Sequence, residues 1–311
     1  MLAGRLDAAI ADQPGSVGAR EIASVSAHSL TAANYSEVQD HFLRREPDVD
    51  AFRPRGPFSV TVQPDRELRL TGAERIKADL YLASPPAKAP LVIFMHGHES
   101  SKGAHAHQAA HLASWGLHSL SVQLPNTGPW DANGGALARL VRAIHRAPQS
   151  VDPRIDMSRI ILIGHSFGAY AAAFALAEGA PAAGAVLLDP AAPGKGAPNV
   201  LRRIRKPVMV LGADDDADVP RNRDYYFEYV RSDIAEVSVK DAAHEDAQYP
   251  SDFALLNGGV DPDTTEALQI TFASAITAAA ISIAGTGRLD YAWSSLRRLI
   301  QEGRLFNART K

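Results

Sequence analysis

The sequence contains no cysteine among its 311 residues. Disulfide bonds, catalysis by a thiolate and zinc sites with cysteine ligands are therefore excluded. The missing cysteines leave the compartment open, because a cysteine-free chain folds in reducing and in oxidising surroundings alike. Residues 1–12 carry charges and lack a long apolar core, so they do not have the pattern of a signal peptide. A secreted or periplasmic chain whose signal peptide had been removed would look the same.

An excess of charge of either sign is also missing. The 32 Lys and Arg residues nearly balance the 35 Asp and Glu residues, which gives a net charge of -3. A nucleic-acid partner requires a basic surplus that neutralises phosphates, so we expect none here. The hydrophobic share of 46% and the charged share of 22% are typical of a folded soluble chain.

Long hydrophobic runs are scarce, and one stretch needs a membrane test. Residues 267–287 carry no charge, and a bilayer is spanned by ~20 residues. The stretch also contains several polar residues, namely Gln269, Thr271, Ser274, Thr277 and Ser282. We therefore expect a buried core helix and no integral membrane segment. Asp263 and Glu266 predict its N-terminal cap, and Gly285 and Gly287 predict its end.

Short continuous apolar runs punctuate the middle of the chain. They lie at 91–95, 117–122, 160–163, 185–188 and 208–211. Strands buried on both faces have this pattern, which implies a mainly parallel sheet between two layers of helices. Helices are predicted between them at 108–114, 135–146, 167–177 and 222–230. Further strands are predicted at 58–62, 76–82 and 235–239, the last of the chain. The alternation of strand and helix predicts an α/β fold with about eight strands.

The segment Gly164-His165-Ser166-Phe167-Gly168 follows one of these strands and precedes a predicted helix. This is the G-x-S-x-G pattern in the strand–turn–helix setting of a nucleophile elbow. Glycines relieve collisions in the tight turn, and the turn aims the N-terminus of the next helix at the serine hydroxyl. Ser166 is therefore the predicted nucleophile, and a merely structural glycine turn is the alternative.

A serine hydroxyl needs a base, and in this topology the chain order is serine, acid, histidine. Of the eleven histidines, His244 alone follows the last predicted strand, in the loop Ala242-Ala243-His244. We predict that His244 is the base; a surface histidine is the alternative.

The acid is open from position alone. Four aspartates follow the strand at 208–211, among them Asp215 and Asp216, and an acid at this strand end can fix the tautomer of the histidine. Asp189, at the end of the preceding strand, is a rival.

An oxyanion hole needs two backbone N–H groups that point at the developing negative charge. Phe167, directly after the nucleophile, predicts one of them. His98, in the loop His96-Gly97-His98 that follows the strand at 91–95, predicts the other.

Five histidines fall close together, namely His96, His98, His105, His107 and His111. His107 and His111 have the i, i+4 spacing of a helical metal-ligand pair, but no carboxylate accompanies them in H-E-x-x-H form. We predict that the cluster lines the site and holds no metal.

Together these motifs resemble the α/β-hydrolase superfamily, and within it the bacterial cutinase, polyester-hydrolase and dienelactone-hydrolase-like group, over residues 58–244. The segment Gly212-Ala213-Asp214-Asp215-Asp216 is similar to the G-A-D-x-D segment in which cutinases carry their acid at the second aspartate. The resemblance therefore favours Asp216 over Asp215 and Asp189. The cutinase tryptophan after the next strand is absent, because Asp189-Pro190-Ala191-Ala192 stands there.

The resemblance and the motifs predict an α/β-hydrolase fold and a serine hydrolase that cleaves small or polymeric carboxylic esters through an acyl-enzyme. This chemistry needs no cofactor. An acyltransferase, thioesterase or amidase with the same triad is the alternative, and a non-catalytic binding protein is a remote one. We expect residues 1–56 to be an extension packed on a catalytic domain, 57–311. The short segment between Asp189 and Lys206 leaves no room for a large cap, and residues 245–262 are expected to cover the cleft in part. The oligomeric state is open.

Overall fold

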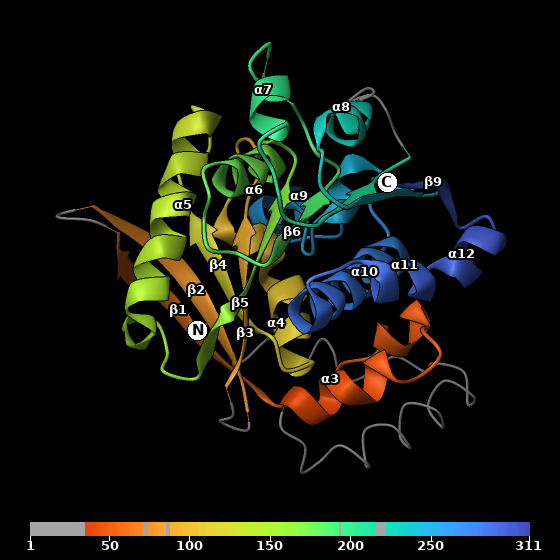
Figure 1. The fold of residues 1–311 in the computed structure, drawn as a ribbon, viewed down its shortest axis with the longest axis horizontal. Helices are drawn as coiled ribbons and strands as arrows, with labels where there is room; N and C mark the ends of the chain where they lie inside the picture. Colours follow the sequence, from red (N-terminus) through yellow and green to blue (C-terminus); the bar gives the residue numbers. More distant parts are fainter. Residues whose placement is uncertain (1–34, 71–73, 85–87, 193, 215–221) are drawn as a thin grey trace.

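A computed structural model of the chain describes residues 35–70, 74–84, 88–192, 194–214 and 222–311. Its centre is a nine-stranded sheet of order β1-β2-β4-β3-β5-β6-β7-β8-β9 (Figure 1). The strands from β3 to β8 run parallel to one another, and β1, β2 and β9 pair antiparallel at the two edges. Their bounds are β1 Val60–Arg69, β2 Arg75–Ala83, β3 Ala89–Met95, β4 His118–Gln123, β5 Ile155–His165, β6 Gly184–Leu188, β7 Val208–Gly212, β8 Ile234–Val239 and β9 Leu305–Thr310.

Helices cover both faces of this sheet (Figure 1). One face packs against α5 Trp130–Arg146, α6 Phe167–Ala177, α7 Ala197–Leu201 and α8 Asn222–Tyr229. The other packs against α3 Tyr35–Leu43, α4 Ala106–Ser114, α10 Glu266–Thr286, α11 Asp290–Ser295 and α12 Arg297–Gln301. The 3-10 helices are η1 Val49–Phe52, η2 Lys102–His105, η3 Pro148–Ser150 and η4 His244–Ala247, and α9 is Asp252–Asn257.

The central strands are apolar on both sides because both sides are covered. In β3, Val92 and Phe94 join the core under α4 and α10, whereas Leu91 and Ile93 join the core under α5 and α6. All four side chains are fully buried. The predicted parallel sheet with helices on either side is confirmed.

Helix α10 confirms the core helix predicted at 267–287. It is long and apolar enough to cross a membrane, but 83% of its most apolar window is buried inside the fold. The predicted cap is wrong, because Thr265 is the N-cap and its side chain accepts the Leu268 N–H. Gly287, with φ 66, ends the helix as predicted, and Gly285 lies within its last turn.

The C-terminal region differs from the prediction in two respects. A ninth strand, β9, follows β8, so β8 is not the last strand and the sheet exceeds the expected eight. Arg309 of β9 binds the buried carboxylate of Glu236 in β8, with Nη2 and Oε2 2.9 Å apart. The helical spacing of Leu289, Trp293, Leu296 and Ile300 in the sequence predicts a single amphipathic helix, but the structure divides this segment into α11 and α12.

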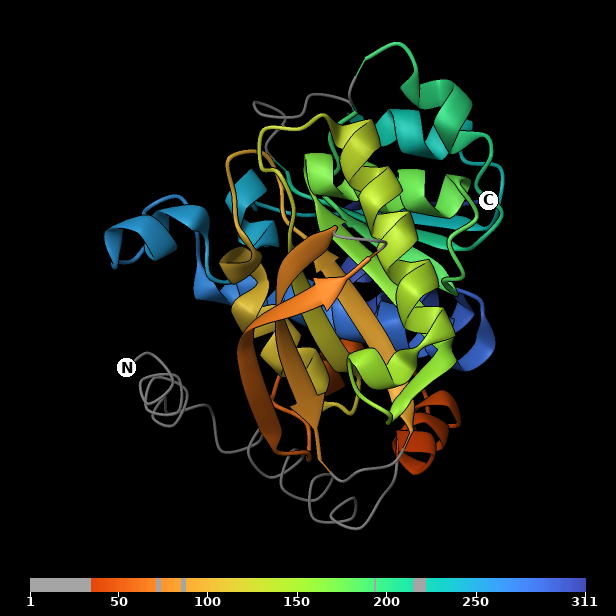
Figure 2. The same ribbon diagram turned by 90° about the vertical axis from the view of Figure 1, so that its left-hand side faces the viewer.

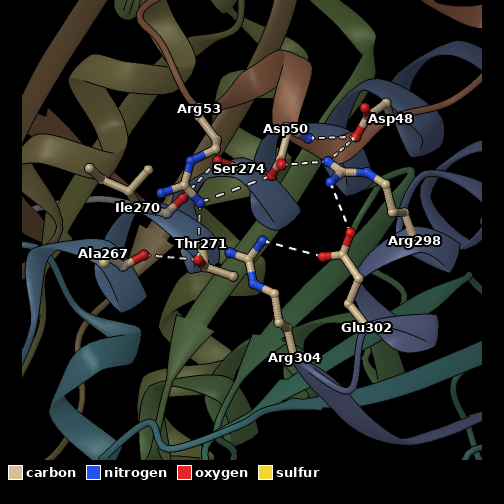
Figure 3. A network of polar contacts seen from close by, with 10 residues as sticks. All are labelled: Asp48, Asp50, Arg53, Ala267, Ile270, Thr271, Ser274, Arg298, Glu302 and Arg304. Carbon is tan, nitrogen blue, oxygen red and sulfur yellow. Dashed lines mark hydrogen bonds and ion pairs between the residues drawn. The ribbon is translucent and has the colours of Figure 1, made fainter. Parts of the chain in front are cut away.

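The described N-terminal residues lie against the C-terminal helices. Arg298 of α12 binds the carboxylates of Asp48 and Asp50 at η1 and that of Glu302, the C-cap of its own helix (Figure 3). Arg53 reaches the hydroxyl of Thr271 in α10 at 3.4 Å. Residues 35–56 thus pack on the same core as α10, and the division of the chain at residue 56 stays a prediction.

Loops at the carboxyl ends of the parallel strands gather on one edge of the sheet, where open α/β sheets carry their sites. The described part of the connection from β6 to β7 contains only the short helix α7, as expected for a fold without a large cap. The segment around α9 projects from the body of the molecule (Figure 2), and its Leu256 is 83% exposed.

Candidate active site

Ser166 occupies the sharp turn between β5 and α6. Its φ of 54 lies in the left-handed region, which is costly for a residue with a side chain and is typical of functional turns. The two glycines of the motif make this turn possible. A Cβ on Gly164 would lie 2.2 Å from the carbonyl oxygen of Gly168, and one on Gly168 would lie 2.2 Å from that of His96. The predicted elbow is therefore present, and a side chain at either glycine would collide with a backbone oxygen.

The backbone of Ser166 is bound to the residues that follow β6. Its N–H donates to the oxygen of Leu188 at 3.0 Å, and its own oxygen accepts the N–H of Ala191 at 3.1 Å. These bonds fix the serine beside Asp189, which lies between the two partners in the chain. The side chain of Asp189 therefore projects from the same edge of the sheet as the serine.

Asp189 forms a short hydrogen bond with His244. The distance between His244 Nδ1 and Asp189 Oδ2 is 2.6 Å. Both residues are buried, with Asp189 0% and His244 7% exposed. An ionised carboxylate only accepts, so Nδ1 carries the proton, and a neutral ring then has its lone pair on Nε2. This arrangement orients an imidazole to take up a proton at Nε2.

The structure thus brings His244 to the alternative acid that follows β6. Asp216, which the resemblance favours as the acid, and Asp215, the alternative beside it, lie outside the described residues. The preference for Asp216 stays untested, but the described geometry assigns His244 Nδ1 to Asp189.

The second oxygen of Asp189 is held by groups that the sequence did not single out. Oδ1 accepts the N–H of Ala213 at 2.9 Å, and Nη1 of Arg223 lies 3.8 Å away. Arg223, near the start of α8, also donates to the oxygen of Ala213. The two oxygens of Asp189 therefore face different partners, so the carboxylate cannot rotate without breaking one set. A buried arginine eleven residues beyond a strand end is a weak sequence signal.

The loop after β3 packs directly against the elbow. A Cβ on Gly97 would lie 3.1 Å from Cβ of Ser166, so a larger residue would crowd the serine. Phe167 is the first residue of α6, where backbone N–H groups have no acceptor within the helix. His98 is the residue after Gly97, and Phe167 is the residue after the serine. Their role as oxyanion donors stays a prediction.

Trp130 completes an aromatic cluster at this place, although no sequence motif marks it. Its ring stacks on Phe167 with centroids 5.4 Å apart and an interplanar angle of 11°. The His98 ring meets both edgewise, at 6.4 Å from Trp130 and 6.0 Å from Phe167. The cluster borders the serine, because Phe167 is its neighbour in the chain.

The five clustered histidines divide by environment. His96 and His105 are fully buried, whereas the side chain of His98 is 48% exposed. Burial lowers the pKa of His96, and it lowers the pKa of His105 to about 4. Within the described part of the chain, no group of three or more potential ligands could hold a metal ion. His107 and His111 thus lack the further ligands that a metal site needs there.

A mainly parallel sheet, a serine elbow after β5 and an aspartate–histidine pair at the carboxyl edge define the class of α/β hydrolases. Residues 92–303 match the Alpha/beta hydrolase family, and the chain belongs to this family. A search of curated proteins found no match. Membership confirms the predicted fold and supports a hydrolase. The cutinase-like subgroup stays a prediction.

Proposed function

We propose that the protein is a serine hydrolase of carboxylic esters, with Ser166 as nucleophile, His244 as general base and Asp189 as the acid that orients the base. The bond of 2.6 Å between Asp189 and His244 carries the proposal. A buried carboxylate that fixes the tautomer of a histidine is the arrangement that activates a serine. The strained elbow that presents Ser166 supports the same reading.

The proposed reaction has two halves. Nε2 of His244 takes the hydroxyl proton of Ser166 while the serine oxygen attacks the acyl carbon. The protonated histidine then gives this proton to the leaving alcohol, and an ester links the acyl group to Ser166. Water attacks this ester with the same proton relay, which releases the acid and restores the serine. Asp189 stays ionised throughout and stabilises the charged imidazole.

The backbone N–H groups of Phe167 and His98 are the proposed oxyanion donors. Loss of one such donor in a serine hydrolase costs about 10²–10³-fold in kcat. The helix α6 begins at Phe167, so its N-terminus adds a favourable partial charge at the same point. The proposed substrates are small or polymeric esters.

Covalent labelling tests the proposal. A fluorophosphonate should label the wild type at Ser166, and Ser166→Ala should abolish both labelling and hydrolysis of nitrophenyl esters. The expected loss in kcat is on the order of 10⁴-fold or more. Ser158→Ala, an exposed serine on the same strand β5, is the matched control and should behave as the wild type. Retention of a tenth of the wild-type kcat by folded Ser166→Ala would overturn the assignment.

The same preparation separates the alternatives. Nitrophenyl esters of increasing chain length report the acyl preference. Competing alcohols reveal an acyltransferase, while matched thioesters and amides reveal a thioesterase or an amidase. A folded wild type that neither labels nor turns over any of these would favour a non-catalytic binding protein.

A further inference from the structure

His165, directly before the proposed nucleophile, makes a hydrogen bond with each of its ring nitrogens. Nε2 lies 3.1 Å from the backbone oxygen of His244, and Nδ1 lies 2.9 Å from Nε2 of Gln248. The His165 ring also lies against that of His244, with centroids 4.3 Å apart. His165 is 2% exposed, so these contacts are made away from solvent.

The partners fix the proton on this ring. A backbone carbonyl only accepts, so Nε2 of His165 carries the proton and donates it to His244. Nδ1 is then bare and accepts an N–H of Gln248. Burial, and next the nearby rings of His244 and His105, lower the pKa of His165 well below its usual value. The ring therefore stays neutral, which is the form that these two bonds require.

Gln248 has one orientation that satisfies its surroundings. Its Nε2 donates to His165 and, at 3.1 Å, to Oδ2 of Asp252, while its Oε1 accepts the backbone N–H of Asp252 at 3.2 Å. The reversed amide would place its oxygen against a bare nitrogen and a carboxylate, both of which are acceptors. Gln248 is 2% exposed, and an unmatched buried pair of this kind is costly.

The chain of bonds continues to the loop that holds His98. Oδ1 of Asp252 accepts the hydroxyl hydrogen of Ser100 at 2.8 Å, and Ser100 is 3% exposed. Burial raises the pKa of Asp252. One run of hydrogen bonds thus joins the segment that begins at His244, the turn that carries Ser166 and the loop after β3. The proposed reaction needs these three segments in fixed relative positions.

We propose that His165 is a positioning residue that holds His244 in place for the proton transfer, and that Gln248 in turn holds His165. This inference rests on the proposed function, because it assigns His244 the role of base. His244 begins the short 3-10 helix η4 in a connection between β8 and α10, where no regular ladder fixes its backbone. The bond from His165 ties that backbone to the elbow that carries Ser166. A displacement of about 1 Å at such a base costs on the order of 10²-fold in rate.

Two substitutions at His165 separate positioning from packing. His165→Phe keeps a ring but removes both bonds, and should lower kcat on the order of 10–10²-fold with KM within twofold. His165→Gln can still donate an amide N–H at the place of Nε2, and should recover a large part of this loss. Gln248→Leu, which leaves both catalytic side chains and His165 in the chain, should lower kcat in the same sense. The measurements are kcat and KM with a soluble nitrophenyl ester, the rate of fluorophosphonate labelling and Tm.

His118→Asn is the matched control. His118 is another fully buried histidine, at the amino end of β4 and thus at the opposite edge of the sheet, and its Nδ1 accepts the N–H of Ala83 at 3.2 Å. The control should lower Tm and leave kcat within twofold. If His165→Phe and Gln248→Leu keep kcat within twofold, or lose no more than the control at equal loss of Tm, the inference is overturned.

The two proposals fail in different ways. A wild type that neither labels nor hydrolyses esters removes the proposed function, and the inference with it. An active wild type whose His165 and Gln248 variants are equally active removes the inference alone. If His165→Phe does not fold, Gln248→Leu and His165→Gln still decide by their kcat.

Discussion

At the scale of single residues, Asp189 divides its two oxygens between different tasks. Oδ2 meets His244 at 2.6 Å, while Oδ1 receives the N–H of Ala213 at 2.9 Å beside the guanidinium of Arg223. The residue has a φ of 33, so its backbone is strained. Such strain persists where surrounding contacts over-determine a conformation, and it is frequent at functional positions. The carboxylate is therefore held by structure on all sides and has little freedom to move away from the histidine.

Substitution of the candidate acids tests this assignment. Asp189→Asn should lower kcat on the order of 10³–10⁴-fold, because an amide that donates to Nδ1 forces the wrong histidine tautomer. Asp216→Asn is the matched control and should stay within tenfold of the wild type. Steady-state kinetics on both purified variants, with Tm as a check of folding, decide the matter. The reverse order of effects would return the role of acid to Asp216.

The pH dependence of activity follows from the same pair. The base must be neutral, and an ordinary histidine titrates near ~6.5. Burial lowers the pKa of His105 to about 4 and that of His165 far below normal, so these rings stay neutral and add no step near pH 6. We therefore expect kcat/KM to fall through a single acidic limb below neutral pH and to stay high at moderately alkaline pH.

Two observations would contradict this profile. Residual activity of His244→Ala should lack the limb, and persistence of the limb there would assign it to another group. Added EDTA should leave the profile unchanged. A loss of activity with EDTA that zinc restores would make the histidines at 96–111 a metal site.

The residues of the site differ in how far the sequence alone could identify them. The glycines at 164 and 168 identify Ser166 in the sequence, because the tight turn requires glycine at both positions. His244 follows from chain order, and the structure supports it through its contact with Asp189. The choice between Asp189 and Asp216 depends on which strand end comes within 3 Å of an imidazole, and that distance is a property of tertiary packing. Arg223 and Trp130 are defined by contacts with distant residues, so no local pattern marks them.

At the scale of elements, helix α5 contains adjacent glycines with opposite surroundings. A Cβ on Gly134 would lie 2.6 Å from Cβ of Phe174 in α6, so this glycine permits close packing of two helices. A Cβ on Gly135 would meet only Nη1 of Arg139, at 3.5 Å, which is an ordinary van der Waals distance. Position 134 therefore requires glycine, whereas position 135 has room for a side chain.

The pair predicts changes of opposite sign in the free energy of unfolding. Gly135→Ala should raise it by up to about 1 kcal/mol, because alanine has the higher helix propensity. Gly134→Ala should lower it by about 1–3 kcal/mol, since α5 and α6 must move apart. Urea denaturation of both variants measures the two values under identical conditions. Equal effects from the two changes would show that propensity, not packing against Phe174, dominates this helix.

The elements that sequence patterns missed lie where local signals are weak. Strand β9 has a single buried residue, Leu305, and its sequence Leu-Phe-Asn-Ala-Arg-Thr shows neither a long apolar run nor a clean alternation. Glu236, a carboxylate within the buried strand β8, is an indirect indication of β9, because it binds Arg309 of that strand. The cap of α10 was misplaced by two residues, because Thr265 and Asp263 are both good capping types and the geometry of the preceding loop decides between them.

At the scale of the whole molecule, the sheet was predictable because burial on both faces imposes a strong sequence signature. The five apolar runs correspond to five of the six parallel strands, and the helices predicted between them are present. The packing of residues 35–56 on α10 and α12 was expected only in outline. The ion pairs of Arg298 with Asp48 and Asp50 join residues some 250 positions apart, a separation at which local patterns carry no information.

Buried neutral histidines also make the stability of the whole fold depend on pH. His105 and His118 are fully buried, and burial lowers the pKa of each from 6.5 to about 4. Between these pH values the unfolded chain binds protons that the native chain excludes. Stability should therefore rise with pH from about 4 to 6.5, and these groups should contribute no slope above that range.

The size of this effect can be measured on one residue at a time. A histidine that is neutral when folded and protonated when unfolded contributes at most ~1.4 kcal/mol per pH unit. His118→Asn keeps an acceptor for the N–H of Ala83 but removes the titration, so it should reduce the slope of unfolding free energy against pH between 4 and 6.5. Urea titrations at a series of pH values, on wild type and variant in parallel, give this difference in slope, from which the carboxylates common to both proteins cancel. Identical slopes would mean that His118 binds its proton equally well in the folded and unfolded chain, against the effect expected from its burial.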